Sequence, residues 1–253
     1  MPRRKKTTQH KNTLIVGLAI VLLVMVAIGI GWHYITPSTP ASTSTANILP
    51  ESSSSMAYAS TATSSISFNL AMSLLAGSPP TLGSPNASVT IVEFGDYQCP
   101  TCDEWYRSQE PQLVQSLVTT GKAKFVWRDF DYFGPDSVSA SEAAYAAGEQ
   151  GKFWQFHDLL FQNQQMPNNG WASKQNMETF AQLLGLNMTE FDQSINSGKY
   201  DSLINSNYSL GAQVGVSGTP TFFLVGPNGK IVTIAGGQPE SVFEQAVASL
   251  TSG

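Results

Sequence analysis

The feature that most constrains this chain is a strand-like run that leads directly into a Cys-x-x-Cys pair, at residues 89–102. The run is β-branched and aromatic, as in a buried strand, and only Glu93 interrupts it. Cys99 and Cys102 are the two cysteines of the 253-residue chain. Such a pair has three common uses: a redox dithiol, half of a zinc site, or a pair of structural thiols. The remainder of the sequence has to distinguish between them.

The residues between the cysteines favour the start of a helix. Pro100 suits the first helical position, because its missing N–H has no intrahelical partner there. Cys99 then takes the N-cap, where unpaired N–H groups and the helix dipole favour a thiolate. Cys102 follows one turn later, within reach of a disulfide with Cys99. We therefore predict that Cys99 is the exposed, attacking thiol and Cys102 the buried, resolving thiol.

Charge is distributed unevenly along the chain. The formal net charge is −5, but residues 1–12 hold 5 of the 13 basic residues, so residues 13–253 carry 8 basic against 18 acidic residues, a net −10. The negative net charge of residues 13–253 argues against nucleic-acid binding by this part of the chain. The basic cluster precedes a hydrophobic segment, where its simplest role is to set the membrane topology.

Residues 14–35 predict a transmembrane anchor. Leu14–Ile30 contains no charged residue, and an apolar length of roughly 20 residues suffices to cross a bilayer core of ~30 Å. A cleaved signal peptide would have a shorter apolar region and a better cleavage site after it. We expect an uncleaved single-pass anchor in the cell membrane, with the basic tail 1–13 in the cytoplasm and the rest outside. Three Asn-x-Ser/Thr sequons, compatible with glycosylation outside the cytoplasm or with chance, begin at Asn86, Asn187 and Asn207.

Residues 36–82 predict a disordered linker. Roughly half of residues 36–65 are Ser or Thr, and such a composition buries too little apolar surface to offset the entropy of ordering. Ile66–Leu75 is more apolar, and either packs as a short helix on the domain or lies against the membrane. Gly and Pro residues at 77–85 mark the start of the folded region at about residue 83.

The folded region, 83–253, predicts an α/β fold. A strand at 89–95 precedes a helix that runs to about residue 120, with a break near Glu110 because Pro111 follows. A second strand at 123–130 then suggests a parallel pair. Further helices are expected at 137–150, 152–164, 173–184, 189–197 and 200–214. Two hairpin strands are expected at 221–225 and 230–234, and a last helix at 240–250. This order describes a βαβ half and a ββα half, with helices inserted at about 135–214 and helices on both faces of the sheet.

Three stretches of the sequence together resemble one family. They are residues 89–102, which hold Cys-Pro-Thr-Cys; residues 148–161, Gly-Glu-Gln-Gly-Lys-Phe-Trp-Gln-Phe-His-Asp-Leu-Leu-Phe; and residues 215–223, Gly-Val-Ser-Gly-Thr-Pro-Thr-Phe-Phe. The folded region resembles the DsbA-like thiol:disulfide oxidoreductases, which have a thioredoxin fold with an inserted helical subdomain. The resemblance extends over almost the whole folded region and is far more specific than a Cys-x-x-Cys pair alone.

The resemblance implies that Cys99 is the nucleophilic cysteine and Cys102 the resolving one, with Pro100 and Thr101 shaping the site between them. The most strongly oxidising members of the family have Pro-His between the cysteines, and a histidine there can stabilise the thiolate. Thr101 can offer only a hydroxyl. Because thiolate stabilisation favours the reduced form and makes a stronger oxidant, this departure leaves the reduction potential open.

The resemblance also implies two walls around the cysteines. Thr219-Pro220 matches the loop that faces them, which has a cis proline bond and a backbone that pairs with an extended substrate segment. Thr219 would be the side chain nearest the disulfide. Glu93 matches a buried acid beneath the active site, where a raised pKa would let it exchange a proton with Cys102.

A metal site is the weaker explanation of the cysteine pair. A structural zinc ion needs about four ligands, and the chain has one Cys-x-x-Cys pair. His10 and His33 lie in the tail and the anchor. His157 lies in an aromatic helical stretch and is expected to be a packed or hydrogen-bonded core residue. We therefore predict no metal.

These features predict a membrane-anchored enzyme that exchanges its Cys99–Cys102 disulfide with thiols of exported proteins, most simply as an oxidase. No nicotinamide or flavin motif is present in the sequence, so we expect no bound cofactor. The resemblance implies reoxidation by an integral membrane, quinone-linked partner. The alternative enzyme is a reductase or isomerase of the same fold, although residues 36–80 offer no obvious dimerisation domain. The alternative of another class is a redox-inactive tethered chaperone or binding module.

Overall fold

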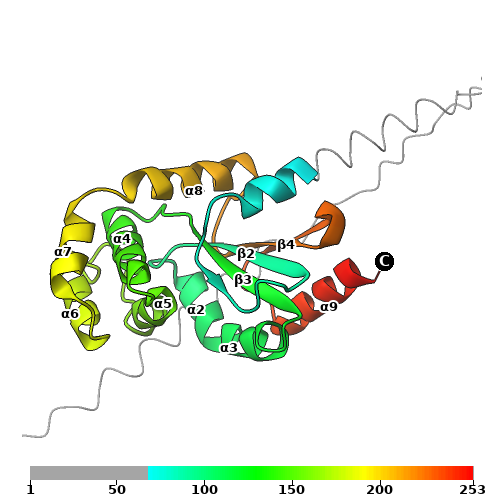
Figure 1. Cartoon of the computed structure of the whole chain (residues 1–253), viewed down its shortest axis with the longest axis horizontal. Coiled ribbons are helices and arrows are strands. Elements are labelled where there is room, and N and C mark those ends of the chain that lie inside the picture. The colour runs from blue at the N-terminus through cyan, green and yellow to red at the C-terminus, as the bar shows by residue number, and fades with distance from the viewer. Residues whose placement is uncertain (1–67, 253) are drawn as a thin grey trace, which may run out of the picture. The chain divides into compact units, whose positions relative to one another are not determined.

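The computed structural model describes residues 68–252 of the chain. These residues form a five-stranded sheet with strand order β1-β3-β2-β4-β5 (Figure 1). β2 and β3 are parallel, whereas the other neighbouring strands are antiparallel. The strands are β1 (Thr81–Leu82), β2 (Val89–Gly95), β3 (Ala123–Asp129), β4 (Thr221–Val225) and β5 (Ile231–Ala235).

Helices connect the strands and form an insertion between β3 and β4 (Figure 1). In chain order they are α2 (Pro100–Ser108), α3 (Glu110–Leu113), the π-helical turn η1 (Val114–Val118), α4 (Pro135–Glu149), α5 (Phe153–Gln162), α6 (Lys174–Leu183), α7 (Met188–Asn196), α8 (Asp201–Gln213), the 3₁₀ turn η2 (Pro227–Gly229) and α9 (Glu240–Thr251). The insertion α4–α8 coincides with the helical subdomain predicted at about 135–214. The predicted thioredoxin fold with a helical insertion is thus the observed architecture.

Each face of the sheet is covered by different helices, because successive side chains along a strand point to opposite faces. On one face, Ile91 of β2 packs in a cluster with Trp105 of α2 and Phe243 of α9. On the other face, Val92 packs in a cluster with Leu74, which belongs to a helix at 68–75. β2 is therefore buried on both sides, as its unbroken apolar run predicts.

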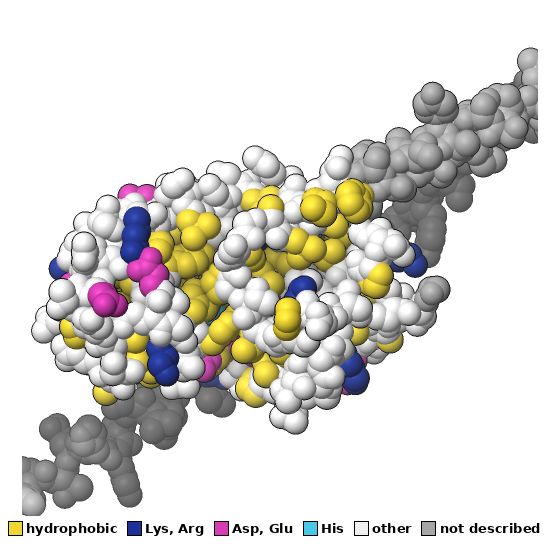
Figure 2. Space-filling model, in the orientation of Figure 1, with side chains coloured by type: hydrophobic (Ala, Val, Ile, Leu, Met, Phe, Trp, Pro, Cys, Tyr) yellow, Lys and Arg dark blue, Asp and Glu magenta, His cyan; other side chains and the backbone are white. Residues whose placement is uncertain are grey.

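A third hydrophobic cluster fills the helical insertion and reaches the cysteines. It joins Phe156 and other aromatic residues of the insertion to Tyr97, Cys99, Cys102 and Trp127. Figure 1 shows α4, α5, α6 and α7 gathered beside one end of the sheet. Apolar side chains also gather in the middle of the face seen in Figure 2. The Cys-x-x-Cys pair consequently lies where the insertion meets the sheet.

The helix that follows the cysteines is broken where the sequence predicts. α2 ends at Ser108, and α3 begins at Glu110 with Pro111 in its first turn. Pro111 has no N–H to continue the ladder of hydrogen bonds from α2. The segment then continues into the π-helical turn η1 before Gly121, whose positive φ of 74° ends it.

The folded region includes residues upstream of residue 83. Residues 68–75 form a helix, and β1 pairs with β3, although the sequence places both segments in the linker 36–82. Leu74 is fully buried, so the helix packs on the domain rather than standing free of it. The guanidinium of Arg128 donates to the carbonyls of Leu74 (3.1 Å) and Ala76, and so pairs carbonyls at the helix end. These contacts join segments some 50 residues apart, so the local composition does not reveal them.

The predicted basic tail 1–13, anchor 14–35 and linker residues 36–67 lie outside the described residues. Within residues 68–252, no helix has the length and apolar character that a bilayer crossing requires. The anchor therefore stays a prediction from the sequence.

The three sequons differ in their accessibility. Asn86 and Asn187 are exposed. Asn207 is only 2% exposed, its amide nitrogen donates to Asp129 (2.9 Å), and its amide oxygen accepts from Arg128 (2.7 Å). The Asn207 side chain is thus part of a buried hydrogen-bond network and is not available to carry a glycan in the folded protein.

Candidate active site

The two cysteines occupy the predicted positions at the start of α2. Cys99 is the N-cap residue, with φ −75° and ψ 119°, and Pro100 follows at the first helical position. The carbonyl of Cys99 accepts the N–H of Asp103 (3.1 Å), which closes the first helical turn. Cys99 and Cys102 are free thiols, so the structure represents the reduced form. Pro100 and Thr101 are exposed between them.

Cys99 is buried, and the prediction that it is the exposed thiol is wrong. Only 2% of its surface is accessible. Its Sγ lies 3.3 Å from the carbonyl oxygen of Thr219, and the side-chain amide of Gln164 donates to the Cys99 carbonyl (3.1 Å). Burial raises the pKa of the Tyr132 hydroxyl, and Cys99 and Thr219 are close enough to influence that pKa as well. These neighbours lie far away in the sequence, so the Cys-x-x-Cys motif gives no sign of them.

The environment of Cys99 favours its thiolate. The pKa of Cys99 is lowered to about 6, and the hydrogen bond with the Cys102 side chain has the largest effect. Thr219 and the backbone N–H groups of Cys102 and Thr101 lower this pKa as well, whereas burial opposes the shift. Cys99 is therefore mostly ionised at neutral pH. Thr101 contributes through its backbone N–H, so this stabilisation does not require the histidine that strongly oxidising family members have.

Cys102 and Glu93, in contrast to Cys99, favour their protonated forms. Burial raises the pKa of the Cys102 thiol, and Cys99 and Glu93 raise it further. Burial likewise raises the pKa of Glu93, and the negative charges of Glu110 and Cys99 raise it further. Glu93 lies within β2, between β3 and β4, and is 1% exposed. Two buried groups that both favour their protonated forms thus lie behind the Cys99 thiolate, as proton transfer between Glu93 and Cys102 requires.

The loop before β4 faces the cysteines, as the resemblance implies. The Thr219–Pro220 peptide bond is cis. Thr219 is buried, and its carbonyl accepts from the Cys99 thiol in the protonated form. Its hydroxyl has no hydrogen-bond partner among the described residues. The hydroxyl is consequently free to donate to Cys99 once that sulfur is ionised.

The loop before Cys99 is held by side chains that the sequence did not identify. Asp96 accepts hydrogen bonds from the backbone N–H groups of Gln98 (2.7 Å) and Tyr132 (2.9 Å). The side chain of Gln98 bonds to Asn168 in the loop after α5, and Gln164 donates to the carbonyl of Tyr97 (2.7 Å). The helical insertion therefore fixes the backbone that leads into the redox pair.

His157 and Glu110 form a further group of buried polar side chains. His157 of α5 is fully buried, and its Nδ1 lies 3.0 Å from the hydroxyl of Tyr97, which confirms the prediction of a packed, hydrogen-bonded core histidine. Its Nε2 lies 3.9 Å from Oε2 of Glu110. The sequence offers Glu110 only as an ordinary helical glutamate before a proline, so its place beside His157 comes from the fold alone.

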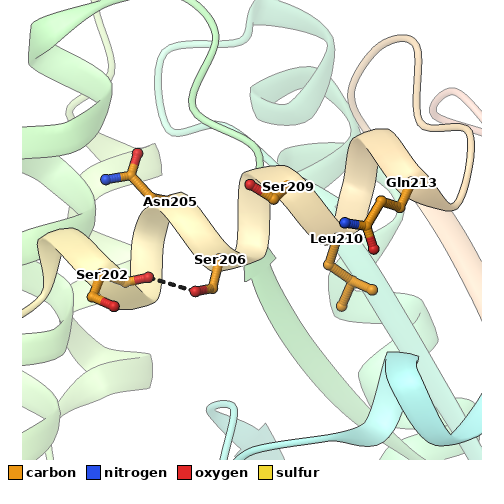
Figure 3. Close-up of a pocket in the computed structure, with 6 residues that line it drawn as sticks. All are labelled: Ser202, Asn205, Ser206, Ser209, Leu210 and Gln213. Carbon is orange, nitrogen blue, oxygen red and sulfur yellow. Dashed lines mark hydrogen bonds between the residues drawn. The ribbon is translucent and has the colours of Figure 1, made fainter.

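Other candidate sites are separate from the cysteines. Within residues 68–252, no three His, Cys, Asp or Glu side chains are grouped so that they could hold a metal ion. A cavity of about 540 Å³ lies along α8 (Figure 3) and is lined by Ser202, Asn205, Ser206, Ser209, Leu210 and Gln213. Its lining is mostly uncharged polar side chains of one helix, without a cysteine or an ionisable group. The redox pair therefore remains the candidate active site.

Comparison with known proteins agrees with this architecture. The thioredoxin family model matches residues 76–237. The chain is 34% identical over 146 residues to Na(+)/H(+) antiporter NhaA 1 of Salinispora arenicola, a match that covers 57% of this chain but only 21% of that protein. It is 27% identical over 150 residues to Probable disulfide bond formation protein D of Bacillus anthracis, covering 57% of this chain and 69% of that protein.

Among solved structures, the thiol-disulfide exchange protein alpha-DsbA2 from Wolbachia pipientis matches with a TM-score of 0.60 at 24% identity. This match covers 75% of the present chain and 98% of the Wolbachia chain, and it shows a common fold that includes the helical insertion. Because the family model spans more than half of the sequence and the observed fold agrees with it, this chain belongs to the thioredoxin family.

Proposed function

We propose that this protein is a thiol:disulfide oxidoreductase that passes its Cys99–Cys102 disulfide to thiols of other proteins, most simply as an oxidase. The observation that carries the proposal is the N-cap position of Cys99, where its pKa falls to about 6. A stabilised thiolate is a good leaving group and favours the reduced form, so the disulfide is readily donated. Similarity to a protein named for disulfide bond formation supports the same activity.

In the proposed cycle, a substrate thiolate attacks Sγ of Cys99 in the oxidised protein. The bond between the two cysteine sulfurs breaks, and Cys102 leaves as a thiolate that takes a proton from Glu93. A second substrate thiolate then attacks the substrate sulfur of the mixed disulfide, and Cys99 leaves as a thiolate. Two electrons pass from substrate to the cysteine pair, so the cycle needs no bound cofactor. The backbone beside Thr219-Pro220 would pair with the substrate segment.

The location and partners complete the proposal. The basic tail and the apolar segment 14–35 support a single-pass anchor with the enzyme outside the cytoplasm, where disulfides persist. Substrates would then be exported proteins with free thiols. Regeneration of the disulfide requires an electron acceptor, for which we propose an integral membrane, quinone-linked protein.

The reduction potential of the cysteine pair tests the direction of transfer. We expect a glutathione redox series to give a value above about −200 mV, as in oxidases of exported proteins, whereas a value near −270 mV, about that of thioredoxin, would contradict an oxidase and favour a reductase. Cys99→Ser should abolish disulfide transfer to a reduced model protein, and Thr101→Ala should not, because Thr101 acts through its backbone. A chaperone or binding module would keep its function in Cys99→Ser.

A further inference from the structure

We propose that Glu110 is a second proton-transfer residue of the site, which carries protons between Glu93 and solvent, with His157 as its positioning partner. The inference rests on the proposed thiol–disulfide exchange and extends it. It concerns three buried polar groups, Glu110, His157 and Tyr97, that exchange between the two cysteines does not by itself use.

Two buried polar atoms without hydrogen-bond partners provide the first argument. Oε2 of Glu93 and Nε2 of His157 are buried, and neither has a hydrogen-bond partner among the described residues. Oε2 of Glu110 lies 3.9 Å from Nε2 of His157. The His157 ring lies 4.9 Å from the ring of Trp127, which is the residue opposite Glu93 in the β2–β3 pair, and Glu110 is the charged group with the largest effect on the pKa of Glu93. A buried polar atom without a partner costs about 1–3 kcal/mol. Such a cost is typical of a site where the atom has a task other than stability.

Burial gives the second argument, because it falls steadily from the sulfur to the surface. Cys102 is fully buried and Glu93 is 1% exposed, whereas Glu110 is 6% exposed. A proton that Glu93 gives to Cys102 cannot be replaced from solvent directly while the site stays closed. Glu110 is the neighbouring acid that reaches the edge.

The surrounding charges explain why Glu93 can hold a proton. Glu93 influences the pKa values of Cys102 and Tyr97, which burial raises, and it is itself influenced by Glu110 and Cys99. Glu110 lies 3.9 Å from His157 and is one of the charges that influence Tyr106. No Lys or Arg within the part of the chain that the structure describes forms an ion pair with either glutamate. Burial and then the negative charge of Glu110 raise the pKa of Glu93, so Glu93 holds the proton that Cys102 receives.

His157 is held so that it can position Glu110. The Tyr97 hydroxyl occupies Nδ1 of His157 at 3.0 Å, which leaves Nε2 for Glu110. The imidazole is fixed further by Trp127 and Phe161, with ring centroids at 4.9 Å and 5.0 Å. The ring therefore offers Glu110 a polar atom in a defined place.

The proton balance of the step is as follows. A substrate thiolate bonds to Sγ of Cys99, the disulfide breaks, and the electron pair remains on the Cys102 sulfur. Glu93 protonates that sulfur, Glu110 reprotonates Glu93, and solvent reprotonates Glu110. When the dithiol is reoxidised, the proton travels the same path outward.

The test compares Glu110→Gln with Glu104→Gln, a matched loss of one charge at an exposed position in α2. The rate at which glutathione reduces the oxidised full-length protein is measured from pH 5 to pH 9. We expect Glu110→Gln to slow this rate about tenfold, within the range for loss of general acid–base catalysis, and to change its pH profile. Glu104→Gln should stay within about twofold of the wild type, since surface changes have small effects.

Three further variants separate proton transfer from packing. Glu110→Asp keeps a carboxyl group and should recover most of the rate, and formate should restore the rate of Glu110→Ala by supplying a small proton carrier. Glu93→Gln combined with Glu110→Gln should be no slower than Glu93→Gln alone, because two steps of one path are not additive.

The inference is overturned if Glu110→Gln reacts like the wild type, if formate has no effect, or if the two glutamine variants slow the reaction multiplicatively. In each of these cases thiol–disulfide exchange by the wild type would still stand. A wild-type protein that does not react with glutathione would contradict the proposed function and this inference together.

Discussion

At the scale of single residues, the site depends on two sulfurs in opposite environments. Cys99 takes the helix N-cap and is ionised at neutral pH, while Cys102 is enclosed one turn later and stays protonated. The hydrogen bond between them lowers the pKa of Cys99 and raises that of Cys102. Each sulfur therefore prepares the other for its step in the exchange.

This coupling can be measured by substitution of Cys102. Because the Cys102 side chain is the largest cause of the low pKa of Cys99, Cys102→Ala should raise that pKa from about 6 towards the ~8.5 of a free cysteine. Cys102→Ser keeps a hydrogen-bond donor and should give an intermediate value. Titration of the thiolate by ultraviolet absorbance measures both variants. Equal pKa values in Ala and Ser variants would show that Cys102 acts by something other than its hydrogen bond.

At the scale of elements, the helix at 68–75 shows how a short segment is held by a single partner residue. Arg128 of β3 donates to the carbonyls of Leu74 and Ala76 at the helix end and also to Asn207 of α8. Leu74 adds an apolar contact with the cluster on this face of the sheet. The helix is thus a structural part of the domain, although the sequence places it within the predicted linker 36–82.

Two adjacent leucines of this helix provide a matched test. Leu74 is fully buried, whereas Leu75 is 37% exposed. We expect Leu74→Ala to lower the free energy of unfolding by about 2–5 kcal/mol, through lost transfer energy and the cavity left behind. Leu75→Ala should cost under about 1 kcal/mol, because it removes little buried surface. Urea unfolding measures both, and equal losses would mean that the helix does not pack on the sheet in solution.

At the scale of the whole molecule, the sheet and the helical insertion meet at the redox pair. The sheet supplies Glu93, the loop before β4 supplies Thr219, and the insertion supplies Gln164 and His157. Cys99 is buried because these parts converge on it. A substrate can reach its sulfur only when some of these neighbours move, so the stability of the closed site affects the rate of exchange.

The redox state should therefore change global stability in a manner that depends on pH. The pKa of Cys99 is about 6 in the folded reduced protein and ~8.5 in an unfolded chain, so the unfolded state binds more protons between these values. The stability of the reduced protein should rise from pH 6 to about pH 8, and this gain disappears as the pH falls through 6. Above about pH 8.5 the raised pKa of Cys102 opposes the gain, because only the unfolded chain ionises that thiol.

Urea unfolding of the reduced and oxidised forms across this range provides the measurement. The oxidised protein has no free thiolate and serves as the control for all other titrating groups. The difference in unfolding free energy should favour the reduced form increasingly between pH 6 and pH 8. A difference that does not change over this interval would show that the Cys99 thiolate does not stabilise the folded state.

The sequence alone determined the elements and the chemistry of the pair, because these depend on local patterns. The apolar run at 89–95, the proline after Cys99 and the break at Pro111 each act on neighbouring backbone, and the structure has the corresponding elements. The resemblance to a known family predicted Glu93 and Thr219 as further residues of the site, and the fold brings both to the site.

The tertiary structure alone decided what depends on contacts between distant segments. It buries Cys99 under the insertion and the loop before β4, encloses Asn207 in a polar network, and brings Glu110 within 3.9 Å of His157. None of these residues carries a local signal of its neighbours, since burial and pKa are set by groups from other elements. The motif therefore identifies the reactive sulfurs, and the packing around them determines their protonation and access.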